Sequence, residues 1–209
     1  MTLYVDFPSH RRTAFTRVEL AAILAICFLI AAPLFISASS RAKARSQRID
    51  CARNLQALGL VFKTWALDHG DQFPMSFRNK LTPAPPAFEF FQVLSNEIAK
   101  PNILICPADV RRPAQNLSDG FSNLNLSYFV GLDATDSNPQ MFLFGDRNLS
   151  DGPLPATRIL ILNTNYPLGW TREMHFPQGN IGLADGSVQQ FSTARLKKAS
   201  VNGGRLAMP

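Results

Sequence analysis

Four side chains of the types that hydrolases use lie in the C-terminal half of the chain: Asp146, His175, Asp185 and Ser187. A catalytic serine needs a base within hydrogen-bonding distance, and families built on such a pair often mark it with a Gly-x-Ser-x-Gly turn. Ser187 lies in no such turn. Aspartates and serines in loops more commonly satisfy nearby backbone groups. The sequence therefore predicts no catalytic residue and no enzymatic activity.

The three cysteines occupy different surroundings. Cys27 lies inside a long apolar run, whereas Cys51 and Cys106 follow it. Only the last two are placed to pair, and a Cys51–Cys106 disulfide would restrict the unfolded chain if this part folds in an oxidising compartment. Two buried free thiols are the alternative. The chain has no Cys-x-x-Cys and no His-x-x-x-His pair, so its spacing predicts no zinc site.

A stretch without charged side chains runs from Leu20 to Ser40. As a helix it would extend about 30 Å, which matches the hydrocarbon core of a bilayer. Glu19 stands directly before this stretch, and a short leader containing Arg11 and Arg12 comes earlier. An unpaired carboxylate in hydrocarbon is costly, so we expect Glu19 either among lipid headgroups or beside a partner of opposite charge.

The composition fits one ordinary domain and a separate apolar anchor, because the chain has 209 residues of which 46% are hydrophobic. The net charge is +6, and a short basic stretch follows the apolar run: Arg41, Lys43, Arg45, Arg48 and Arg53. Beside a membrane span such a stretch favours contact with anionic headgroups or a solvated helix face. No motif that reads nucleic acid accompanies it, so no nucleic-acid partner is expected.

Apolar residues continue at helical spacing after the basic stretch, at Cys51, Leu55, Leu58, Phe62 and Trp65. This pattern predicts an amphipathic helix that continues from the anchor and ends near His69-Gly70. Four parts follow from these boundaries. We expect a leader over 1–14, the membrane half of the helix over 15–40, its amphipathic half over 41–70, and a globular head over 71–209.

The head begins with a predicted short helix over 88–98. Brief apolar runs separated by turn residues follow and predict strands at 103–106, 126–130, 141–144, 159–162, 181–184 and 188–191. Asp185-Gly186 predicts a type I′ hairpin turn between the last two strands. Ser192 is the expected N-cap of a final helix that runs through Ala199. The fold class is therefore α+β, with a long N-terminal helix packed on a small, loop-rich antiparallel sheet.

The order of features at the N-terminus resembles the prepilin cleavage and methylation motif of type IV pilins and type II secretion pseudopilins. A basic leader is followed by Ala14, Phe15, Glu19 and the long apolar helix. The resemblance implies that a prepilin peptidase cuts after Ala14 and that Phe15 becomes the methylated N-terminus. It also implies that Glu19 pairs with the terminal amine of a neighbouring subunit. The family usually has Gly at position 14 and an uncharged residue at the position of Arg17.

The head carries further motifs that resemble one subgroup of pseudopilin-like proteins with prepilin-type N-termini. These are Cys51-Ala-Arg-Asn-Leu, Cys106-Pro-Ala-Asp, Ser127-Tyr128, Gly145-Asp146-Arg147-Asn148, and His175 followed by Gly179-Asn180 and Ala184-Asp185-Gly186-Ser187-Val188. The resemblance implies a pilin-like fold. A calcium site like that of some pseudopilins would draw on Asp133, Asp136 and Asp146, although EF-hand spacing is missing and Asx turns are the alternative. No other cofactor is expected.

Together with the apolar anchor, the resemblance implies a structural subunit of a type IV pilus or a type II secretion pseudopilus, held in the bacterial inner membrane by one span. Its head would lie in the periplasm, or on the cell surface after assembly. The expected partners are prepilin peptidase, other pilin or pseudopilin subunits, the inner-membrane assembly platform and the bilayer. The alternative is a single-pass anchored or secreted binding domain that does not assemble. A secretory signal peptide cut near Ser37-Ala38-Ser39 belongs to this second interpretation.

Overall fold

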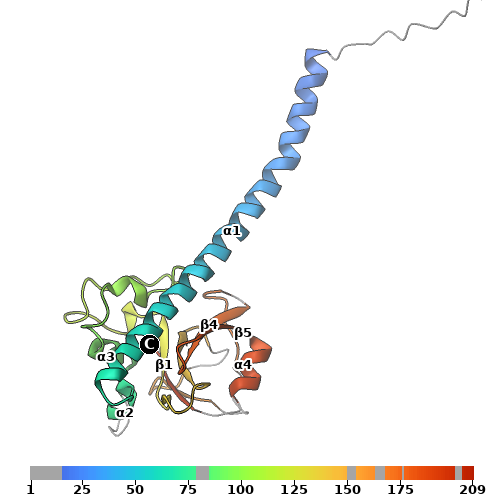
Figure 1. The fold of residues 1–209 in the computed structure, drawn as a ribbon. Coiled ribbons are helices and arrows are strands. Elements are labelled where there is room, and N and C mark those ends of the chain that lie inside the picture. Colours follow the sequence, from blue (N-terminus) through green and yellow to red (C-terminus); the bar gives the residue numbers. More distant parts are fainter. Residues whose placement is uncertain (1–15, 79–84, 150–153, 163–167, 176, 201–203) are drawn as a thin grey trace, which may run out of the picture. The chain divides into compact units, whose positions relative to one another are not determined.

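A computed structural model of the chain describes residues 16–78, 85–149, 154–162, 168–175, 177–200 and 204–209 (Figure 1). The predicted leader, with Ala14 and Phe15, lies outside the described residues. The chain divides into two compact units, Met1–Lys43 and Ala44–Pro209. The second unit therefore includes most of the predicted amphipathic half-helix together with the head.

The long N-terminal helix is confirmed as α1, Arg17–Asp68, which has 52 residues and continues through Pro33. Its end follows the prediction closely. Gly70 has a left-handed φ of 66°, and the Asp71 N–H donates to the carbonyl of Ala66 at 2.9 Å. This bond and the left-handed glycine form a Schellman ending, which satisfies a carbonyl that the last turn leaves free.

The first part of α1 is long and apolar enough to cross a membrane, by length and composition. Its large side chains, such as Leu24, Phe28 and Phe35, are exposed within the first unit. Such a run of exposed apolar side chains is rare in water-soluble monomers. The structure thus agrees with one membrane-spanning helix at the N-terminus.

A six-stranded antiparallel sheet forms the centre of the second unit, in the order β3-β6-β1-β2-β4-β5. Its strands are β1 (Tyr128–Gly131), β2 (Phe142–Asp146), β3 (Ile159–Ile161), β4 (Gln178–Leu183), β5 (Val188–Ser192) and β6 (Arg205–Ala207). The structure confirms five of the predicted strands. It adds β6, a short strand between β3 and β1 that the sequence did not predict. The long helix and the antiparallel sheet together confirm the α+β class.

The predicted strand at 103–106 is wrong. Its first residues lie in a 3₁₀ helix, η1, Pro101–Leu104, and Ile105 and Cys106 belong to no strand. Pro101 fixes φ near the helical value at the start of this turn, and the Ile105 N–H then donates to the carbonyl of Asn102 at 3.2 Å. Leu104 is buried through the turn.

The remaining helices are short. They are α2 (Pro74–Arg78), α3 (Ala87–Val93), η2 (Asn123–Asn125) and α4 (Thr193–Ser200). The helix predicted over 88–98 is thus shorter, because the chain leaves helical geometry at Leu94 and continues as turns. The predicted cap of the last helix is confirmed, since the Ser192 Oγ accepts the Arg195 N–H at 3.3 Å.

The turn between β4 and β5 is not the predicted type I′ turn. Gly186 has a φ of 86°, but Asp185 does not have a positive φ. The Leu183 carbonyl accepts the Gly186 N–H at 2.9 Å, and the Leu183 N–H donates to the Ser187 carbonyl at 2.8 Å. This is a three-residue loop in which a type I turn is followed by a left-handed glycine.

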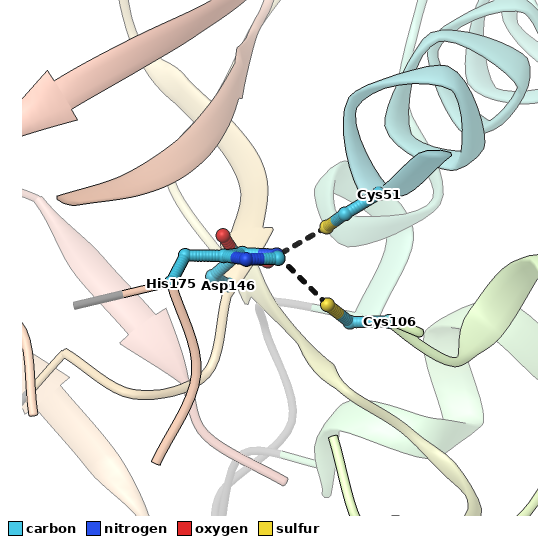
Figure 2. Close-up of side chains that lie close together, drawn as sticks. All are labelled: Cys51, Cys106, Asp146 and His175. Carbon is cyan, nitrogen blue, oxygen red and sulfur yellow. Dashed lines mark hydrogen bonds between the residues drawn. The ribbon is translucent and has the colours of Figure 1, made fainter. Parts of the chain in front are cut away.

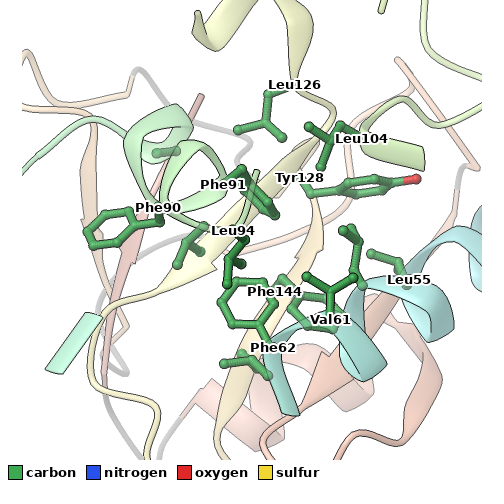
Figure 3. Close-up of a cluster of buried hydrophobic side chains, with 14 of the residues drawn as sticks. Leu55, Val61, Phe62, Phe90, Phe91, Leu94, Leu104, Leu126, Tyr128 and Phe144 are labelled. Atoms are coloured by element: carbon green, nitrogen blue, oxygen red, sulfur yellow. The ribbon is translucent and has the colours of Figure 1, made fainter. Parts of the chain in front are cut away.

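One face of α1 forms the middle of the main hydrophobic core. Phe62 packs against the rings of Phe91 and Phe144, with ring centroids 5.9 and 5.4 Å apart (Figure 3). The Phe73 ring lies 6.2 Å from that of Phe62. The predicted apolar face of the amphipathic helix is confirmed, since the residues Cys51, Leu55, Leu58, Phe62 and Trp65 are all buried. A second hydrophobic cluster lies on the opposite face of the sheet and includes Trp170 and, from α4, Leu196.

The two faces of α1 predict a contrast between neighbouring leucines. Leu58 is fully buried, whereas Leu60 is 70% exposed. Leu58→Ala should destabilise the head by about 2–5 kcal/mol, because it leaves a cavity. Leu60→Ala, the matched control, should change the stability by less than about 0.5 kcal/mol. Urea unfolding followed by the fluorescence of Trp65 and Trp170 measures both variants, and equal destabilisation would contradict the assigned packing of the helix.

Candidate functional site

Four chemically reactive side chains meet inside the head: Cys51, Cys106, Asp146 and His175 (Figure 2). They come from α1, the turn after η1, the end of β2 and the segment before β4. One ligand atom from each lies within 4.8 Å of the others. The three residues Cys51, Cys106 and Asp146 have no solvent-exposed surface, and His175 is 8% exposed. We call this group the four-residue cluster.

Two hydrogen bonds run across the cluster. The Cys51 Sγ donates to the Asp146 Oδ1 at 3.1 Å, and the Cys106 Sγ lies 3.0 Å from the His175 Nε2. The hydroxyl of Tyr128 lies 3.6 Å from the Cys51 Sγ. All four members therefore face one another and not the aliphatic core around them.

The position of Cys51 follows from the face of α1 on which it lies. Gln47 and Asn54 share this face, and their side-chain amides donate to the carbonyls of Pro107 and Ile105 at 2.9 and 3.0 Å. These carbonyls flank Cys106 in the chain. The helix thus holds the Cys106 turn by two side-chain bonds, one on each side of the cysteine.

The position of Asp146 follows from the pairing of β2 with β4. Its Oδ2 accepts the backbone N–H of Asn180 at 2.7 Å. The preceding residue, Gly145, has no room for a side chain, because a Cβ would lie 2.7 Å from the Phe129 ring and 2.8 Å from the Asn180 carbonyl. The glycine therefore lets the two strands approach closely enough for this bond.

An ion pair joins the segments that carry Cys106, Asp146 and His175. The Arg147 guanidinium donates to both carboxylate oxygens of Asp109, at 2.8 and 3.0 Å, and the Ser127 hydroxyl donates to the same carboxylate at 2.8 Å. Arg147 also pairs with Glu173. The Asp109 side chain is fully buried and that of Arg147 is 15% exposed, so this contact is shielded from solvent. Paired donors of this kind fix both distance and orientation.

The electrostatics of the cluster favour a charged sulfur on Cys106. The neighbouring Cys51 thiol, which can donate to the Cys106 sulfur in place of Asp146, lowers the pKa of Cys106 to about 5, with a further contribution from His175 and against the effect of burial. Burial lowers the pKa of His175, but the bond to Cys106 and the charge of Asp146 outweigh it, so the net shift is upward. Burial and the charge of Cys106 raise the pKa of Asp146 to about 7. The proton is thus more easily lost from Cys106 than from an ordinary thiol.

A thiolate beside an imidazole is also the arrangement of a cysteine nucleophile. A nucleophile has to reach a substrate, whereas Cys106 has no exposed surface and its sulfur faces three other polar side chains. The arrangement is better suited to holding something between the four side chains than to attacking a molecule from solvent.

Cys51 and Cys106, for which the sequence leaves a disulfide and two buried free thiols as alternatives, are brought together as free thiols. The disulfide therefore stays a prediction. Cys27 is exposed in the first unit and takes no part in the cluster.

The three calcium candidates do not share a site. Asp133 binds Arg205, accepting its backbone N–H at 2.8 Å as well as its guanidinium, and Asp136 pairs with Lys63. Only Asp146 lies in the four-residue cluster. Asp185 is one of the four residues considered for hydrolase chemistry. Its carboxylate accepts the Ser187 N–H at 2.8 Å in the β4–β5 loop, so it satisfies a local backbone group, as loop aspartates commonly do.

Glu19 has a local partner at the start of α1. Its Oε2 accepts the backbone N–H and the hydroxyl of Thr16 at 2.8 and 3.0 Å, and the Thr16 Oγ1 lies 3.3 Å from the Glu19 N–H. These reciprocal bonds form a capping box. Its sequence signal, Thr-x-x-Glu directly before an apolar run, lies within the processing motif, so one short segment carries both features.

Sequence reasoning did not find the four-residue cluster. Its members are 55, 40 and 29 residues apart along the chain, so no short spacing marks them. The signal that was available is that the head motifs quoted above contain all four residues, together with Tyr128 and Asn180. The structure brings these separated motifs to one place. Comparisons with protein-family models, curated proteins and solved structures found no match for this chain.

The ion pair beside the cluster leads to a prediction. Arg147→Ala should destabilise the head by about 3 kcal/mol, because it leaves the buried Asp109 carboxylate without its partner. Arg53→Ala is the matched control: it breaks an exposed pair with Asp50 and should cost less than about 0.5 kcal/mol. Urea unfolding followed by tryptophan fluorescence measures the difference. A small effect for Arg147→Ala would show that this pair does not hold the site together.

Proposed function

We propose that the chain is a structural, non-enzymatic subunit of a type IV pilus or a type II secretion pseudopilus. In this proposal a prepilin peptidase removes the leader after Ala14, and the helix that begins at Phe15 anchors the protein in the bacterial inner membrane. Assembly then occurs through this helix, with the head in the periplasm or on the cell surface. The partners are other pilin-like subunits and the inner-membrane assembly platform.

The observation that carries the proposal is the start of α1. A 52-residue helix begins at Arg17, has a carboxylate in its first turn, and continues as an exposed apolar run. The apolar run needs lipid or other helices around it, and the Glu19 charge at its edge favours a position beside an opposite charge. A neighbouring subunit's terminal amine is a partner that satisfies this requirement and also selects one register between subunits.

The capping box gives Glu19 a second role, and the two roles can be separated. Glutamine also serves at this position of a capping box, because its side-chain oxygen accepts the same N–H bond. Glutamine has no charge, however, and cannot form an ion pair. A role in capping is therefore kept in Glu19→Gln and lost in Glu19→Ala, whereas a role in pairing is lost in both.

We therefore expect Glu19→Gln to abolish incorporation into filaments as completely as Glu19→Ala, while the amount of membrane-bound protein stays unchanged. Asp68→Asn, which removes a carboxylate at the other end of the same helix, is the control and should assemble normally. Sheared-filament fractions and cross-linking of cells measure assembly. Normal assembly of Glu19→Gln would show that capping alone explains this residue.

Processing gives a second prediction. Intact-mass and N-terminal peptide measurements on the membrane-extracted protein should find Phe15 as the first residue, carrying one methyl group. Ala14→Gly, which introduces the residue usual in the family, should be cut at the same bond. An N-terminus at Met1 or near Ser40 would contradict the proposal and would favour an anchored or secreted binding domain that does not assemble.

A further inference from the structure

The four-residue cluster presents two sulfurs, one imidazole nitrogen and one carboxylate oxygen to a common centre (Figure 2). These are the three ligand types that zinc binds in proteins, and four protein ligands are the usual number in a structural site. Calcium and magnesium take oxygen ligands, so this mixed set does not suit them. The donor set by itself therefore selects a borderline-soft divalent metal.

The distances between the donors are close to those of a tetrahedral site. With zinc–sulfur bonds of about 2.3 Å and zinc–nitrogen or zinc–oxygen bonds of about 2.0 Å, neighbouring ligand atoms lie about 3.3–3.8 Å apart. The two hydrogen-bonded pairs are now 3.0 and 3.1 Å apart, and every pair lies within 4.8 Å. Movements of less than about 1 Å would bring the four atoms to metal-binding distances.

The surrounding bonds already orient the donors as an outer shell does in metal sites. The Asn180 N–H holds one oxygen of Asp146 at 2.7 Å and leaves the other oxygen facing the cluster. The Ala108 N–H lies 3.4 Å from the Cys106 Sγ, and the Tyr128 hydroxyl lies 3.6 Å from the Cys51 Sγ. Once the two thiols have lost their protons to a metal, these three groups are placed to donate to the charged oxygen and sulfurs, which is the role that outer-shell donors have in metal sites.

Charge also favours a cation at this place. Two thiolates, one carboxylate and a neutral imidazole carry three negative charges, which a divalent ion reduces to one. Burial of such a set is costly unless the charges are neutralised, by protons or by a metal. Metal binding releases the thiol protons to solvent and needs no oxidant.

We propose that Cys51, Cys106, Asp146 and His175 form a structural zinc site that fastens α1 to the Cys106 turn and to the end of β2. The four donors fill the coordination of the ion, so the site is closed and has no open position for substrate. It joins parts of the chain that are distant in sequence, and in an oxidising compartment it protects the two thiols from disulfide formation. This role does not depend on filament assembly.

Metal content of the full-length protein is the first test. The protein is purified in detergent with a tag that has no histidines and is dialysed without chelator. We expect one zinc per chain by elemental analysis, and two free thiols at Cys51 and Cys106 by alkylation under denaturing conditions. A chain without metal, or a Cys51–Cys106 disulfide in the intact mass, overturns the proposal.

Matched variants test which residues hold the metal. Cys106→Ser and His175→Gln should lose at least nine-tenths of the bound zinc, whereas Cys27→Ser and His69→Gln, which alter the same residue types outside the cluster, should keep it. Zinc that remains in Cys106→Ser and His175→Gln would be bound elsewhere, and the proposal would then be wrong.

Cobalt substitution keeps the proposal testable if the variants do not fold. The wild-type protein, stripped of zinc and loaded with Co²⁺, should show a thiolate-to-cobalt charge-transfer band and the intense d–d bands of tetrahedral cobalt. Weak octahedral bands without a charge-transfer band would exclude a site with two cysteines. Removal of the metal should also lower the melting temperature of the wild-type head, and an unchanged melting temperature would contradict a structural role.

Discussion

The head depends on the burial of one face of α1. Leu55, Leu58 and Phe62 place this face against the sheet and α3, and the same packing fixes how far along its axis the helix lies. Cys51 is one helical turn before Leu55, so its sulfur reaches the other cluster residues only in this register. A shift by one turn would move it by about 5.4 Å, which is more than the spread of the ligand atoms. Apolar packing therefore positions the polar chemistry.

The parts of the fold that follow periodic patterns could be predicted from the sequence. The helix that ends at Asp68 repeats its apolar residues at helical spacing, and the strands around Val130, Phe144 and Ile181 are short apolar runs bounded by turn residues; a single sequence displays both patterns. The strand expected near Cys106 is instead a 3₁₀ turn started by Pro101, because four apolar residues do not distinguish a strand from a buried turn. The four-residue cluster has no periodic signal, since long-range packing alone brings its members together.

The proposed function and the proposed metal site concern different parts of one helix. The exposed apolar part of α1 with Glu19 at its start would carry membrane anchorage and assembly, and the buried part from Cys51 onward carries the attachment of the head. A subunit that is moved through its anchor needs a head that does not separate from the helix. Coordination of one ion by residues of the helix and the head provides such a link, in addition to the buried apolar face.

The most direct test of the metal centre is X-ray absorption at the zinc edge on the full-length protein as purified. Coordination by Cys51, Cys106, Asp146 and His175 predicts two sulfur neighbours at about 2.3 Å and two nitrogen or oxygen neighbours at about 2.0 Å. The imidazole of His175 should add its weaker outer-shell scattering. A spectrum with nitrogen and oxygen neighbours alone, or a sample without zinc, would contradict the account.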